Sequence, residues 1–215
     1  MIIITQIMIM ENKKNKPAVF LVLVPHRDTR SELQKYGESS DLTDVYSFPC
    51  VTPLAALFHP LGMEELKNYA KKLRKSLGTE KIQVFENSAA VFPAANESLT
   101  LIGPKITINT DFLLHKNEDV KKIYASAHSS SIKNIFDTLV IGTWLAHGSL
   151  EQQTQLCSKL NSNLPSGKLS FRAAAIANMY WRSVIKNNEI AYKWKIEKLC
   201  WLPKETRLSK KTFYF

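Results

Sequence analysis

Hydrophobic residues in this chain gather in short runs that are separated by polar segments. Residues 18–24 are continuously apolar and rich in valine, which predicts a buried strand that ends at Pro25. Residues 46–58 are also largely apolar, and Pro49 and Pro53 predict bends or an edge position within this second strand. Both runs therefore belong to the expected core.

Helical spacing is clearest in residues 62–77, where apolar side chains recur on one face, acidic residues occupy the first turn and lysines the last. Gly78 follows at the position of a C-terminal cap. Weaker patterns predict further helices over residues 29–36, 117–127 and 150–160.

The remaining apolar segments predict further strands. They are residues 82–85, 89–92, 99–108 and 138–144, followed by residues 169–181 and 191–201 on either side of a hairpin-like turn at 186–189. This order of elements is typical of an α+β protein with two comparable halves. Neither a G-x-G-x-x-G nor a GK[ST] motif occurs, which excludes a Rossmann or P-loop nucleotide site, and the sequence contains no HExxH motif.

The composition indicates a folded protein with a strongly basic surface. Of the 215 residues, 45% are hydrophobic and 22% are charged, and the formal net charge of +10 favours polyanionic partners. We expect one domain over residues 18–203 and a basic tail over residues 204–215. Residues 1–17 form either an added edge strand or an N-terminal extension, and we favour a natural start at Met10 over Met1 because an ordinary polar N-terminus follows Met10.

The cysteines and the lengths of the apolar stretches bear on whether the protein has a metal site, disulfides or a membrane segment. Cys50, Cys157 and Cys200 are odd in number and lack a CxxC spacing, which indicates buried thiols and suggests neither a zinc site nor a disulfide framework. Cys50 could act as a nucleophile only beside a base that the sequence does not identify. No apolar stretch reaches the roughly 18–20 residues of a membrane helix. We expect a cytoplasmic protein with no membrane association, no metal and no cofactor.

The order of elements and two local segments are shared with a known family. The order is the strand at 20–24, the strand at 51–58, the helix at 64–77, the strand at 138–144 and the terminal strand pair. The local segments are Phe58-His59-Pro60-Leu61 and Gly142-Thr143-Trp144. Over residues 18–203 the chain resembles the two-histidine (2H) phosphoesterase superfamily, which includes RNA 2',3'-cyclic phosphodiesterases and 2'-5' RNA ligase-like proteins. The resemblance implies an α+β, bilobal, pseudo-symmetric fold with antiparallel sheets around a central cleft and helices outside.

Members of this family carry an H-x-[T/S] motif on one strand of each lobe. One imidazole accepts a proton from the attacking group and the other donates one to the leaving oxygen, while the hydroxyls hold phosphate oxygens. Aligning this chain on Trp144 places Thr138 at the second histidine and Val140 at the residue that carries the second hydroxyl. The second motif is therefore degenerate.

The first motif is degenerate as well. Aligning the chain on residues 58–60 places Pro53 or Leu54 at the first histidine and Ala55 or Ala56 at the hydroxyl position. None of these side chains can transfer a proton. The resemblance thus implies that ordinary 2H catalysis has been lost.

Displaced histidines are the alternative catalytic pair. His59 and His147 each follow the end of an expected cleft strand, so a divergent phosphodiesterase acting on RNA or cyclic nucleotides could use them. The H-x-S tripeptides that begin at His128 and His147 are only 19 residues apart, and we interpret them as chance matches.

The resemblance and the basic charge together lead to one preferred function. We expect a non-catalytic protein that binds RNA or a phosphorylated nucleotide-like ligand in a basic cleft. The candidate ligand-binding residues are Thr52, Thr143, Trp144, Arg172 and Arg182. The alternatives are the divergent phosphodiesterase and a structural or protein-interaction domain whose cleft has closed.

Overall fold

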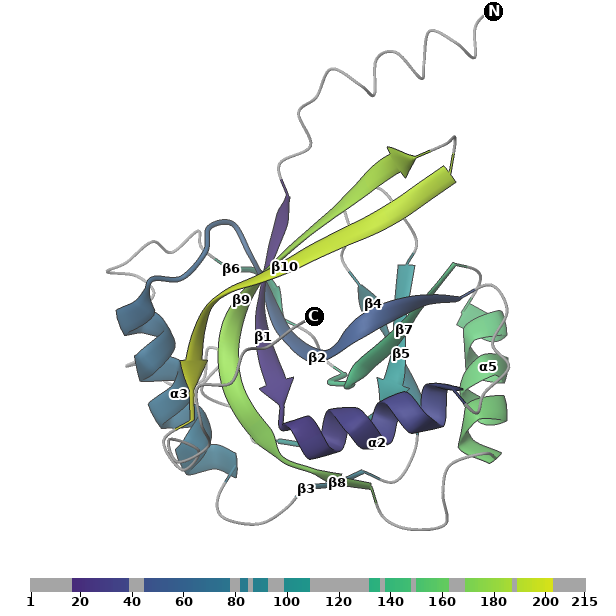
Figure 1. Ribbon diagram of the computed structural model, residues 1–215, viewed down its shortest axis with the longest axis horizontal. Coiled ribbons are helices and arrows are strands. Elements are labelled where there is room, and N and C mark those ends of the chain that lie inside the picture. Colours follow the sequence, from purple (N-terminus) through teal and green to yellow (C-terminus); the bar gives the residue numbers. More distant parts are fainter. Residues whose placement is uncertain are drawn as a thin grey trace, which may run out of the picture.

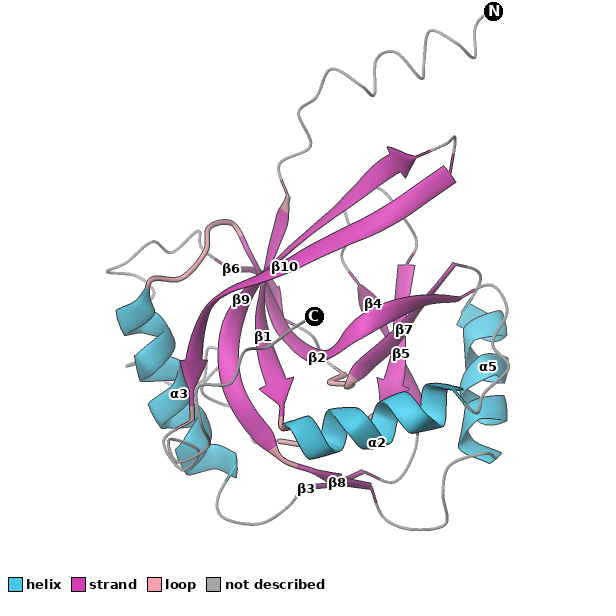
Figure 2. Ribbon diagram, in the orientation of Figure 1, coloured by secondary structure: helices cyan, strands magenta, loops and turns pink. Residues whose placement is uncertain are grey.

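The computed structural model describes residues 17–38, 45–77, 82–84, 87–92, 99–108, 132–135, 138–147, 150–162, 169–186 and 189–202. In these residues the chain forms a mixed α+β fold, with a large antiparallel sheet at the centre and helices at the periphery (Figure 1 and Figure 2). The α+β class expected from the sequence is confirmed.

The described strands are β1 (Ala18–Pro25), β2 (Val45–Leu57), β3 (Ile82–Val84), β4 (Asn87–Phe92), β5 (Leu99–Pro104), β6 (Ile132–Ile135), β7 (Gly142–His147), β8 (Leu169–Phe171), β9 (Ala173–Lys186) and β10 (Glu189–Trp201). The described helices are α2 (Arg27–Glu38), α3 (Met63–Leu77) and α5 (Leu150–Ser162). The sequence pattern did not predict β6. The helix expected over residues 117–127, the cap at Gly78, the N-terminal extension and the basic tail lie outside the described residues.

One sheet contains most of the strands. Its order is β10-β9-β1-β2-β7-β5-β4, with β6 pairing with β2, and β3 and β8 form a separate antiparallel pair. The strand β2 pairs with β1 through residues 52–57 and with β7 through residues 45–51. The two apolar runs from which the cleft was expected are therefore neighbours within one sheet.

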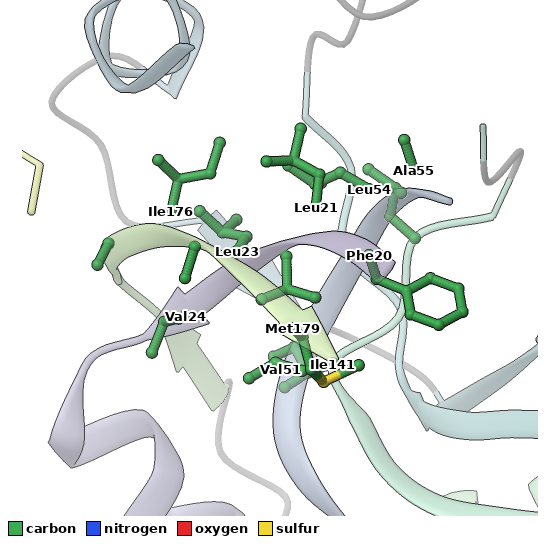
Figure 3. Packing of buried hydrophobic residues seen from close by; sticks show 14 of the residues in the cluster. Phe20, Leu21, Leu23, Val24, Val51, Leu54, Ala55, Ile141, Ile176 and Met179 are labelled. Atoms are coloured by element: carbon green, nitrogen blue, oxygen red, sulfur yellow. The ribbon is translucent and has the colours of Figure 1, made fainter. Parts of the chain in front are cut away.

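The core lies on both faces of β1, as its continuous apolar run predicts. Every residue from Val19 to Pro25 is buried. Leu21 and Leu23 lie on one side of the sheet together with Ile176, while Val24 lies on the other side with Met179 (Figure 3). A strand with alternating polar residues could not occupy this position, because half of its side chains would be buried without hydrogen-bond partners.

The helix α3 begins directly after Gly62, and Glu65 in its first turn caps this end. The Gly62 backbone N–H donates a 2.6 Å hydrogen bond to Glu65 Oε2, which is the reciprocal half of a capping box. The apolar face of the helix, with Leu66, Tyr69, Ala70 and Leu73, is buried in the main core. The connection to β2 is fixed by Asn178 of β9, whose amide bonds both backbone groups of Leu61.

The helix α5 covers a second, smaller hydrophobic cluster. Cys157 and Leu160 of this helix are buried against Ile102 of β5 and against Trp144 and Ala146 of β7. None of the described helices has both the length and the hydropathy that a membrane crossing requires.

Candidate functional site

The expected site lies where β2 and the segment leading into β7 meet. Val51 of β2 is the register partner of Gly142 at the start of β7, so the two runs are paired at this point. The strand β7 begins only at Gly142, and Leu139, Val140 and Ile141 precede it as buried residues. The Ile141 backbone N–H donates to the Pro104 carbonyl at 2.8 Å, which ties this segment to the end of β5.

The positions assigned to the two motifs are occupied mainly by packed apolar side chains. Leu54 is fully buried in the main core, and Ala56 and Val140 are buried in the same cluster. Thr138 is half-buried and is the only hydroxyl residue among the four positions that were assigned to the degenerate motifs. Leu54, Ala56 and Val140 therefore contribute packing energy to the fold and offer no group that could hold a phosphate oxygen.

The three ligand candidates near these runs differ in their surroundings. Trp144 is buried in the smaller cluster beneath α5. The Thr143 hydroxyl donates to the Ile141 carbonyl at 3.0 Å, so it is satisfied within its own segment. Thr52 is fully buried, and its hydroxyl has no hydrogen-bond partner in the described part of the chain. A buried hydroxyl without a partner is uncommon in folded proteins.

The strand β2 bends immediately before Thr52. Between the pairs Ser47–Trp144 and Val51–Gly142, three residues of β2 lie opposite one residue of β7, which produces a bulge. Cys50 takes up this irregularity with a φ of 51°, in the left-handed region that a residue with a Cβ seldom adopts. The bend allows one strand to pair with β1 over one half and with β7 over the other.

The thiol of Cys50 is not activated by its surroundings. Burial raises its pKa to about 11, and the nearby guanidinium of Arg30 lowers it only in part. Arg30 carries a permanent positive charge and cannot accept the thiol proton. At neutral pH the thiol is protonated, which argues against Cys50 as a nucleophile.

The raised pKa of Cys50 can be tested by the rate at which iodoacetamide alkylates its thiol. The experiment uses a variant with Cys157→Ala and Cys200→Ser, in which Cys50 is the only cysteine. At pH 8 we expect Cys50 in the folded protein to react about 100-fold more slowly than in urea, because the thiolate fraction falls with the raised pKa. The unfolded chain loses this proton first, so the free energy of unfolding should fall as the pH rises from about 9 toward 11. If Cys50 reacted at pH 8 as fast in the folded state as in urea, its pKa would not be raised by burial.

The two candidate catalytic histidines do not come together. His147 ends β7 beside the first residues of β2, since Ala146 pairs with Val45, whereas His59 lies two residues beyond the other end of β2. The 13 residues of β2 would span about 40 Å if straight. The bend shortens this span, yet His59 precedes α3 and His147 precedes α5, and these helices are on opposite sides of the molecule (Figure 1). A general acid and a general base for one phosphodiester must both reach it within hydrogen-bond distance.

The two candidate arginines are exposed but lie far apart, one just before β9 and the other within it. Arg172 precedes this strand, where its backbone N–H donates to Thr29 Oγ1 at 3.3 Å and its carbonyl accepts from the His26 N–H. Arg182 lies ten residues further along the chain, on the outer half of the β9–β10 hairpin, and is paired with Lys193. Lys193 was not selected from the sequence. A signal for it was present in the sequence, because the hairpin expected at residues 186–189 would place Lys193 near Arg182, and the pairing of Lys186 with Glu189 agrees with this register.

Comparison with known families and with curated proteins adds no assignment. Neither the scan of protein families nor the search of curated proteins finds a match to this sequence. Within the described residues, no group of three or more His, Cys, Asp or Glu side chains is arranged to hold a metal ion.

Proposed function

We propose that this protein is a non-catalytic relative of the 2H phosphoesterases, built on their bilobal plan, and that it binds RNA. One observation supports the loss of catalysis: where the family's motif strands need imidazoles and hydroxyls, Leu54, Ala56 and Val140 are buried in the core. Without a proton donor and acceptor, the roughly 10²–10⁴-fold that each such group contributes to the rate is absent.

Binding of a polyanion is supported by charge. The chain has a formal net charge of +10, and exposed cationic side chains occur on α3, β9 and β10. A positive potential of this size attracts RNA more strongly than it attracts a single phosphorylated nucleotide, because each neutralised phosphate releases a counterion. RNA is therefore preferred over a small nucleotide-like ligand.

The places of His59 and His147 at opposite ends of β2 argue against the displaced-histidine phosphodiesterase. Incubation with 2',3'-cyclic AMP and with RNA ending in a 2',3'-cyclic phosphate should give no turnover above a buffer control. Turnover that is abolished by His59→Ala or His147→Ala would overturn the non-catalytic part of the proposal.

RNA binding is tested on the same full-length protein by fluorescence anisotropy with a labelled 15-nucleotide RNA. We expect binding at 50 mM NaCl that weakens steeply up to 200 mM, since the affinity comes largely from phosphate contacts. A protein that binds no RNA at 50 mM NaCl would favour the structural or protein-interaction alternative.

A further inference from the structure

The outer half of the β9–β10 hairpin presents two cations that face each other without compensation. Arg182 and Lys193 are direct cross-strand partners, and both are exposed. Neither has an ion-pair partner in the described part of the chain. Like charges directly opposite each other destabilise a sheet. An anion bound between them would remove this repulsion.

An aromatic ring lies next to this pair on the same face. Tyr180 is two residues before Arg182 and is paired with Lys195, so both rows of side chains project from one side of the hairpin. The Tyr180 hydroxyl donates to the Glu197 carboxylate, and Lys195 forms an ion pair with the same carboxylate. Burial and Glu197 both raise the pKa of Tyr180, so the phenol stays neutral and keeps this hydrogen bond. The Tyr180 ring itself is half-buried.

A second aromatic residue is exposed at the same end of the sheet. Phe58 follows Leu57, which is in one cross-strand row with Val19 and Tyr180, and Phe58 is 53% exposed. From there the chain crosses to β9, where the Leu61 N–H donates to Asn178 Oδ1 at 3.1 Å. The exposed ring of Phe58 therefore offers an apolar surface on which a base can stack.

We call Phe58, Tyr180, Arg182, Lys193 and Lys195 the hairpin surface. We propose that this surface binds single-stranded RNA. Bases stack on the two aromatic rings, and Arg182 and Lys193 hold the phosphates. The inference rests on the proposed RNA binding and adds to it the location of the site and the strandedness of the RNA. Aromatic rings beside uncompensated cations are the combination that single strands recognise, because every base has a face to stack and every linkage a charge.

Other polyanions fit this surface less well. An acidic peptide would neutralise the cations and leave the exposed carbon of Phe58 in water. Duplex RNA keeps its base faces stacked inside the helix and offers only backbone to Tyr180. The hairpin also extends away from the rest of the sheet, so that an extended strand can reach both rows of side chains (Figure 1).

The test compares two double charge reversals in the full-length protein by anisotropy with the same 15-nucleotide RNA. The first is Arg182→Glu with Lys193→Glu. The second, Lys71→Glu with Arg74→Glu, makes the identical change in net charge at exposed positions on α3. We expect the hairpin double variant to raise the Kd at least 10-fold and to reduce the salt dependence by about two phosphate contacts. The α3 double variant should raise the Kd less than about 3-fold. Phe58→Ala should weaken binding about 5-fold or more through lost stacking, with the salt dependence unchanged.

Four outcomes would overturn the inference while leaving RNA binding intact. Equal weakening by the two double variants would mean that overall charge alone drives binding. Equal affinity for a blunt RNA duplex would remove the requirement for single strands, and equal affinity for DNA of the same sequence would remove the assignment to RNA. Unchanged binding by Phe58→Ala would remove the stacking. If the wild-type protein binds no RNA at 50 mM NaCl, the proposed function itself fails.

Discussion

Replacing Gly103 with alanine is expected to lower the free energy of unfolding by about 3 kcal/mol or more. A Cβ at this position would lie 1.8 Å from the Ile141 carbonyl oxygen and 2.8 Å from its carbonyl carbon. Both are backbone atoms, so no side-chain rotation can relieve the overlap. Because the Ile141 N–H is also bonded to the Pro104 carbonyl, β5 and the segment before β7 would have to separate.

Urea unfolding followed by tryptophan fluorescence measures this effect, and Gly62→Ala is its control. A Cβ at Gly62 meets only Glu65 Oε2, at 3.4 Å, so we expect a loss of about 1 kcal/mol or less. For a domain of this size the Gly103 variant should melt about 6–12 °C below the wild type. A Gly103→Ala protein as stable as Gly62→Ala would show that the segment at Ile141 is free to move away from β5, which would leave room for a ligand there.

Removing the Asn178 amide should cost about 2–4 kcal/mol. The side chain is fully buried, and it accepts from the Leu61 N–H at 3.1 Å and donates to the Leu61 carbonyl at 2.9 Å. Asn178→Ala would leave both backbone groups buried without a partner. The connection between β2 and α3 would lose its anchor to β9, and we expect α3 to become more mobile as well.

The same unfolding assay tests this expectation, with Asn68→Ala on the exposed side of α3 as the control, for which we expect less than about 0.5 kcal/mol. A second variant, Asn178→Asp, distinguishes hydrogen bonding from packing. Its carboxylate can accept from the Leu61 N–H but cannot donate to the carbonyl, whereas the protonated acid can do both. Burial raises the pKa of such a carboxyl, so this variant should be more stable relative to wild type at pH 5 than at pH 7. A stability deficit that is the same at both pH values would contradict the hydrogen-bond explanation.

Much of the fold follows from local patterns. The strand at 18–24 and the helix at 62–77 were predicted with nearly the observed bounds, because each has an unambiguous periodicity. The terminal hairpin was predicted as well, but the strand expected over residues 169–181 is divided into β8, which pairs with β3, and β9, which continues to Lys186. Of the two possibilities expected from Pro49 and Pro53, the register shifts beside both residues agree with bends, whereas β2 lies between β1 and β7 and is not an edge strand. The strand β6 was missed because its four residues, Ile132–Ile135, are too few to show a period.

The partner of each strand was harder to predict than its existence. Nothing in the residues from Val45 to Leu57 indicates that Cys50 adopts a positive φ, because that conformation is imposed by pairing with two different strands. Thr143 and Trp144 were expected to be ligand contacts because of their place in the motif. In the structure the Thr143 hydroxyl bonds to the Ile141 carbonyl, and Trp144 is buried in the smaller hydrophobic cluster. Whether a polar or aromatic residue faces solvent depends on tertiary packing, which a single sequence leaves open.

The position of β1 in the sheet has a consequence for how the protein must be made. This strand lies between β2, which follows soon after it, and β9, which begins at Ala173 near the end of the 215-residue chain. At about 5–20 residues per second, on the order of ten seconds of translation separate β1 from its second neighbour. During that time one edge of this apolar strand lacks its final partner, and an unpaired apolar edge is a template for pairing with another chain.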